Sequence, residues 1–145
     1  MRTLVAILAV LIGGCAVVQL PAPGPAPLPA PAPPAARTEN AAIAGLLDGA
    51  RADAASGRLA NAAASLERAL RIEPRNPRLW QELARVRLKQ GEYAQTESTA
   101  ARSNSWAGGD STLRAENWRL IAQAREARGD TAGARAALEA ADRQR

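Results

Sequence analysis

Three patterns of hydrophobic and polar positions divide the chain. Residues 4–12 form an uninterrupted apolar run without charge, and residues 21–34 alternate proline with alanine, glycine or leucine. From residue 39 onward, apolar residues recur every three or four positions between charged ones, as in amphipathic helices. These patterns predict a short hydrophobic segment, a linker, and an all-α domain over residues 39–145. The helices are expected at residues 39–56, 60–72, 77–90, 93–104, 113–128 and 131–143.

Residues at the ends of these helices suit the expected boundaries. Asn76 followed by Pro77 is typical of an N-cap with proline at the first helical position. Gly57, Gly91 and Gly129 each follow a predicted helix, where a left-handed C-cap favours glycine. The helices are therefore expected to be joined by short turns.

The helical part of the sequence also repeats itself. Gly57 and Gly91 lie 34 residues apart, and the same spacing relates Leu46 to Trp80. A third copy aligns on Gly129 with an offset of 38 residues, so that four extra residues lie near residues 111–114. A period of this length indicates a stack of similar supersecondary units.

The repeated positions resemble those of the tetratricopeptide repeat. Copy two carries Trp80, Leu83, Ala84, Gly91 and Tyr93, and copy three carries Trp118, Ile121, Ala122, Gly129 and Asp130. Copy one departs from the pattern at Gly49, and the second helix of copy two departs from it at Ala100 and Ser103. The resemblance implies an α-solenoid of three helical hairpins, in which Trp80 and Trp118 pack in the core. Trp106 falls in the expected connection after copy two and has no assigned role.

Composition narrows the possible functions. The chain has no histidine and a single cysteine, which removes the commonest general base and metal ligand and any intramolecular disulfide. The sequence selects neither a glycine-rich phosphate loop nor a catalytic pair of acids. We therefore expect no enzymatic activity, no metal and no cofactor. The net charge of +5 comes almost entirely from arginine, with Lys89 the single lysine.

The N-terminal segment has the pattern of a secretory signal. Arg2 precedes the apolar run, which is shorter than the ~20 residues of a membrane span. Residues Ile12-Gly13-Gly14-Cys15 resemble the bacterial lipobox. The resemblance implies that residues 1–14 are a cleaved signal peptide and that Cys15 receives fatty acyl chains. The alternative is an ordinary signal or uncleaved anchor, in which Cys15 is only a small apolar residue.

Residues 15–38 are expected to form a lipidated linker. Proline fixes φ and lacks an N–H group, so this segment favours extended polyproline II at about 3.1 Å per residue. Residues 16–38 then span roughly 60–70 Å. Since Ala16 replaces the aspartate that retains lipoproteins in the inner membrane, the resemblance implies the periplasmic face of the outer membrane. This location excludes nucleic acid as a partner. A ligand for a proline-binding groove is the alternative reading of the linker.

The family resemblance also implies a binding face. In tetratricopeptide proteins the first helix of each repeat lines a concave groove, which here gives Leu47, Arg51, Arg78, Gln81, Arg85, Leu88, Lys89, Arg119, Gln123 and Glu126. Arg78, Gln81, Arg85 and Lys89 share one helix face, so the groove is expected to be basic and to suit an acidic or carboxylate-bearing peptide. The alternative is the solvated face of an arginine-rich monomer.

The whole arrangement resembles the outer-membrane lipoproteins that activate class A penicillin-binding proteins, in particular the tetratricopeptide-type activators of penicillin-binding protein 1b. That resemblance implies a protein partner, a class A peptidoglycan synthase reached through the cell wall. A scaffold for outer-membrane protein assembly, secretion or pilus biogenesis is the alternative. The long linker favours the activator, because a scaffold working at the outer membrane needs no such reach.

Replacement of the cysteine tests the predicted lipid anchor. The Cys15→Ser chain lacks the thiol that accepts the lipid and is expected to leave the outer-membrane fraction. Mass spectrometry of the wild type should show the added acyl mass. Unchanged fractionation of the variant, with no acyl mass on the wild type, would contradict the lipoprotein assignment.

Overall fold

The computed structural model describes residues 34–144, with side chains from residue 40 onward. The predicted signal peptide, Cys15 and the linker residues up to 33 lie outside the described residues. Within the described part no helix has the length and apolarity needed to span a bilayer.

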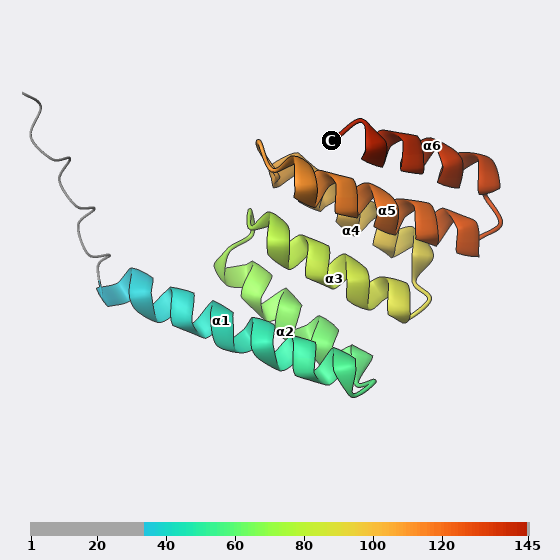
Figure 1. Ribbon diagram of the computed structural model, residues 1–145. Helices are drawn as coiled ribbons and strands as arrows, with labels where there is room; N and C mark the ends of the chain where they lie inside the picture. The colour runs from blue at the N-terminus through green and yellow to red at the C-terminus, as the bar shows by residue number, and fades with distance from the viewer. Residues whose placement is uncertain (1–33, 145) are drawn as a thin grey trace, which may run out of the picture. The chain divides into compact units, whose positions relative to one another are not determined.

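Six α-helices and no strand make up the part of the chain that the structure describes. Figure 1 shows them as three antiparallel hairpins stacked side by side, with α1, α3 and α5 in front and α2 and α4 behind. The predicted α-solenoid of three hairpins is thus confirmed. The bounds are α1 Pro34–Ala55, α2 Leu59–Ile72, α3 Pro77–Lys89, α4 Tyr93–Trp106, α5 Ser111–Ala127 and α6 Thr131–Asp142.

Three helix boundaries differ from the predictions by two residues or more. The first helix begins at Pro34 rather than at residue 39, because proline is well suited to the first turn of a helix and good helix formers follow it. The fourth helix continues to Trp106, and the fifth begins at Ser111 rather than at residue 113. Trp106 is therefore helical and not part of an irregular connection. Because α5 has 17 residues and α3 has 13, about one extra turn of α5 accommodates the four additional residues of copy three.

The turns within the hairpins follow the sequence closely. Gly57, Gly91 and Gly129 have φ values of 76°, 78° and 82°, the left-handed region expected for a helix C-cap. After α3, the amide of Glu92 donates to the carbonyl of Arg87 at 2.9 Å, which closes a Schellman turn. Any residue with a Cβ would be strained at these three positions.

The predicted cap of α3 is also present. The side chain of Asn76 accepts hydrogen bonds from the amides of Arg78 at 3.0 Å and Leu79 at 3.3 Å. Pro77 is the first residue of the helix, where its missing N–H group leaves no donor unsatisfied. The Asn-Pro pair therefore fixes where the second hairpin begins.

The core changes character along the stack. Between α1, α2 and α3 it consists mainly of large aliphatic residues, including Leu66, Leu79 and Leu83. Between α3, α4, α5 and α6 alanines dominate, and only Leu120 and Ile121 add aliphatic bulk to the buried cluster. Alanine buries little apolar area, so the third hairpin needs a further source of cohesion.

Buried hydrogen bonds supply that cohesion. Asn117 on α5 is 0% exposed, and its amide group donates to Ser103 Oγ at 2.7 Å and to Asn104 Oδ1 at 2.9 Å on α4. Its oxygen accepts from Gln81 Nε2 on α3 at 3.2 Å, and Ser103 donates to the carbonyl of Pro77 at 2.7 Å. The polar network formed by Gln81, Ser103, Asn104 and Asn117 thus ties three helices together. It also explains the small, polar Ser103 where the repeat pattern expects an apolar residue.

Removal of the central amide should destabilise the domain. We expect Asn117→Ala to lower the free energy of unfolding by about 2–4 kcal/mol, because it leaves buried partners unpaired. Urea titration followed by circular dichroism measures this loss. The matched control is Asn61→Ala on the exposed face of α2, which should change stability by no more than ~0.5 kcal/mol. Equal stability of the two variants would contradict a role for the network in cohesion.

Candidate functional site

A groove of about 660 Å³ runs across the first helices of the three hairpins. Each of α1, α3 and α5 contributes side chains to it, as expected for the concave face of a helical repeat stack. Seven of the residues selected from the sequence line this groove, namely Leu47, Arg51, Arg85, Leu88, Lys89, Arg119 and Gln123.

The groove also contains residues that the sequence analysis did not select. Several are small or apolar and form its floor, and two are acidic; they are Ala50, Ala54, Ala55, Leu66, Glu82, Val86, Glu116 and Leu120. Helical spacing from Leu47 and Arg51 was a sufficient signal for Ala50 and Ala54. The same spacing was available for Glu82 and Glu116, which lie three residues before Arg85 and Arg119; only their pairing with arginines of the preceding helices depends on how neighbouring hairpins pack.

Three selected residues do not line the groove. Gln81 is only 6% exposed and belongs to the polar network, where it donates to Asn117. Arg78 is exposed near the start of α3 and pairs with Asp110 at 3.3 Å. Glu126 is exposed on α5 outside the groove. Of the four residues predicted to share one helix face, Arg85 and Lys89 line the groove, whereas Gln81 turns inward against α5 and Arg78 lies outside the groove.

Ion pairs cross the groove from one hairpin to the next. Arg51 on α1 contacts Glu82 on α3 at 2.9 Å, and Arg85 on α3 contacts Glu116 on α5 at 2.6 Å. Both pairs are partly exposed to solvent, so each adds little to stability. Their main effect is to hold two of the arginine side chains in place and to neutralise them.

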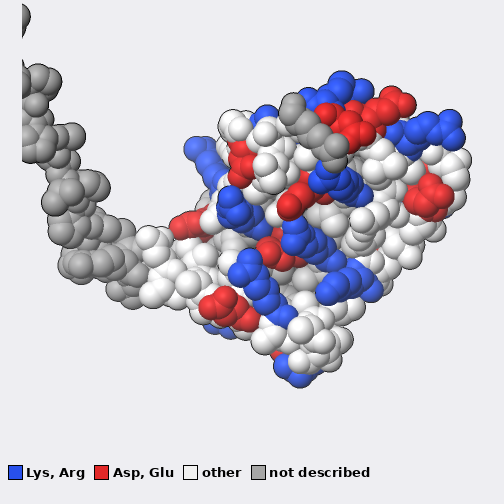
Figure 2. All heavy atoms as spheres, viewed as in Figure 1, with Lys and Arg blue, Asp and Glu red and all other residues white. Residues whose placement is uncertain are grey.

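The groove keeps a positive balance despite these pairs. Four basic and two acidic side chains line it, which leaves a net charge of +2 from Arg51, Arg85, Lys89 and Arg119 against Glu82 and Glu116. Figure 2 shows basic and acidic side chains interleaved across the face on which α1, α3 and α5 lie in front. The sequence predicted a basic groove. The two glutamates make the net positive charge of the groove smaller than that prediction implied.

The chemistry of the groove is that of a peptide-binding surface. Its apolar floor offers buried area to aliphatic side chains, and its basic rim offers hydrogen-bond donors to carboxylates. The described side chains form no group of Cys, Asp or Glu suited to a metal ion. A segment that combines apolar and acidic residues fits this surface best.

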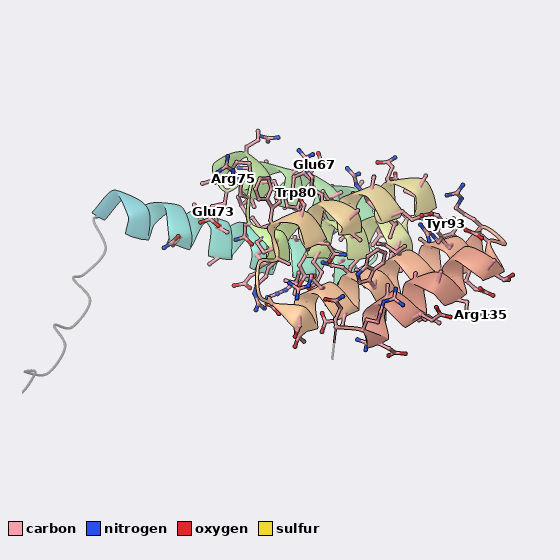
Figure 3. The ribbon with its side chains drawn as sticks, turned by 90° about the horizontal axis from the view of Figure 1, so that it is seen from above. Glu67, Glu73, Arg75, Trp80, Tyr93 and Arg135 are labelled. Carbon is pink, nitrogen blue, oxygen red and sulfur yellow. The ribbon has the colours of Figure 1, made fainter. Side chains whose placement is uncertain are left out.

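The tryptophans lie elsewhere. Trp80 donates from Nε1 to the carbonyl of Pro74 at 2.8 Å, and the Arg102 guanidinium lies 5.3 Å from its ring centroid. Figure 3 shows Trp80 close to Arg75 near the connection between α2 and α3. Arg75 in turn lies 5.1 Å from the ring centroid of Trp106 at the end of α4. The contact of Arg102 with Trp80 lies within the second hairpin, and that of Arg75 with Trp106 joins the connection between α2 and α3 to α4; none of these residues lines the groove.

Comparisons with known proteins agree with this geometry. The tetratricopeptide repeat family model matches residues 53–115. The structure of the globular C-terminal domain of P. aeruginosa LpoP is 50% identical, covers 69% of this chain and 94% of that chain, and superposes with a TM-score of 0.68. The chain belongs to the LpoP-like tetratricopeptide-repeat family. A search of curated proteins finds no match. An LpoP-like repeat domain supports protein–protein interaction, so the groove is the candidate partner site.

A double-mutant cycle tests whether the groove ion pairs exist in solution. Arg85→Gln, Glu116→Gln and the double variant should give a coupling free energy of roughly 0.2–1 kcal/mol in urea unfolding, the range for exposed pairs. Added salt should reduce the coupling. A coupling of zero at low salt would show that Arg85 is free and that the groove is more basic than described.

Proposed function

We propose that this LpoP-like chain is an outer-membrane lipoprotein that binds and activates a class A penicillin-binding protein across the periplasm. The observation that carries the proposal is the 50% identity to the globular domain of LpoP over 94% of that domain. The lipobox at Ile12–Cys15 and the proline-rich linker add the anchor and the reach that such a role requires.

In this proposal the linker determines how far the domain reaches from the membrane. Because α1 begins at Pro34, the linker of this proposal comprises residues 16–33, for which the polyproline II conformation favoured by the sequence corresponds to a length of roughly 55 Å. This length carries the domain from the outer membrane into the cell wall, and the stiffness of the linker limits the volume that the domain searches. Tethering of this kind raises the effective concentration of the domain near its partner.

Activation then follows from binding. A partner segment that enters the groove gains apolar contacts with the floor and charged contacts with the rim. If the domain binds the active conformation of the synthase more tightly than the inactive one, the population shifts towards the active form. The domain itself performs no chemistry in this proposal.

The length of the linker provides the functional test. Deletion of Pro21–Pro33 removes about 40 Å of reach while sparing the first residue of α1. In a strain that depends on the partner synthase, this deletion should abolish growth or produce β-lactam sensitivity. The purified shortened protein should still stimulate the synthase in solution, since the domain is intact.

A replacement linker is the control for this experiment. Another Pro/Ala segment of equal length should restore function in cells, because reach rather than sequence is what matters. A scaffold acting at the outer membrane predicts instead that the deletion is nearly silent. Normal growth with the shortened protein would therefore reject the activator in favour of that scaffold.

A further inference from the structure

Charged residues in and beside the groove repeat along the sequence with a constant spacing. Arginines occur at positions 51, 85 and 119, and acidic residues occur at positions 48, 82 and 116, each set with a spacing of 34 residues. The third copy carries four extra residues in the repeat alignment. Four residues turn a helix by about 400° and advance it by about 6 Å, so its charged pair stays close to the groove face. We call this set, Asp48, Arg51, Glu82, Arg85, Glu116 and Arg119, the charge ladder.

The first two arginines of the charge ladder reach forward to the next hairpin. Arg51 pairs with Glu82, and Arg85 pairs with Glu116, both 31 residues further along the chain. Arg119 is the third member of the series, and no further hairpin follows α5 and α6 within the described residues. Its guanidinium lines the groove, and the described residues give it neither a hydrogen bond nor an ion pair.

Other free donors lie in the same half of the groove. Lys89 is one helical turn after Arg85, and Gln123 is one turn after Arg119; both line the groove, and neither has a partner among the described residues. Leu88 and Leu120 supply apolar surface beside them. The α3–α5 half of the groove thus combines unpaired donors with an apolar floor, whereas the arginine of the α1–α3 half is already paired.

We propose that the partner supplies the missing carboxylate of the charge ladder. An aspartate or glutamate side chain in an apolar segment of the partner pairs with Arg119, and Lys89 contributes a second positive charge. A guanidinium binds a carboxylate through two parallel hydrogen bonds, which also fixes the orientation of the segment. The inference rests on the proposed function, because the segment belongs to the synthase. It assigns recognition to Arg119 and not to Arg51 or Arg85, whose charges are satisfied internally.

Two variants of the groove test this assignment. Arg119→Gln removes the charge, and Gln123→Glu keeps every arginine but places a carboxylate one turn from Arg119, where it can neutralise it. Matched controls outside the groove are Arg135→Gln on α6, labelled in Figure 3, and Gln95→Glu on the exposed face of α4. Each control makes the same chemical change as its groove variant.

The measurement is the affinity of the chain from residue 15 onward, carrying Cys15→Ser, for the soluble periplasmic region of each class A penicillin-binding protein of the same bacterium. We expect Arg119→Gln to weaken binding about tenfold and Gln123→Glu to weaken it several-fold, with both controls near wild type. Arg119→Lys should retain part of the affinity. Circular dichroism melts verify that each variant is folded, and the exposed Gln123 position keeps the test valid if Arg119→Gln lowers stability.

The outcomes separate the inference from the proposed function. If the unsubstituted chain binds none of these synthases, the proposed function is wrong. If it binds one of them and the groove variants bind as well as their controls, the proposed function stands and the assignment to Arg119 is overturned. A smaller salt dependence of binding in Arg119→Gln than in Arg135→Gln would further support a direct charge contact.

Discussion

The buried amide of Asn117 is the interaction on which the arrangement of the second and third hairpins depends. The core around it is rich in alanine and offers little apolar area, so the hydrogen bonds from α3 and α4 set the position of α5. A polar group buried without partners is costly, so the register in which Asn117 pairs with Gln81, Ser103 and Asn104 is favoured. In this part of the core, directional hydrogen bonds therefore position the helices, as large apolar side chains do between α1, α2 and α3.

The same helices that meet at this network present the groove on another face. Gln81 points inward from α3, while Arg85 and Lys89 on the same helix line the groove. On α5, Asn117 is buried, and the carboxylate of its neighbour Glu116 accepts a hydrogen bond from the Arg85 guanidinium at 2.6 Å. Any slip of α5 along α3 would break the buried hydrogen bonds and move Glu116 away from Arg85. The polar interior thus determines the spacing of charges on the exterior, which connects the stability of the domain to its recognition chemistry.

Local signals in the sequence predicted most of the fold. The 34-residue period, the glycines after three helices and the Asn76-Pro77 cap each describe a structure formed by neighbouring residues, and all are found in the structure. The failures have a different origin. Gln81 is buried where Asn117, 36 residues away, accepts its hydrogen bond, and the pairing of Glu82 with Arg51 and of Glu116 with Arg85 depends on the packing of adjacent hairpins. The start of α1 at Pro34 was not predicted, because Pro34 continues the proline-rich pattern of the linker and is also a favourable first residue of a helix.

The charged residues of the ladder have different partners in the first and the third hairpin. At the first hairpin, Asp48 is 80% exposed, and its carboxylate lies within 4.0 Å of Arg51 on the same helix, so this end contains its own counter-charge. At the third hairpin, the described residues place no acidic side chain against Arg119 in the way that Glu82 and Glu116 face the preceding arginines. A second copy that placed its Asp48 against Arg119 would form a heterologous, head-to-tail contact, which leads to rings or open filaments and not to a two-fold dimer. It would also compete with the existing contact between Asp48 and Arg51. A carboxylate on a different protein avoids both difficulties, and the open end of the ladder therefore favours a hetero-complex over self-association.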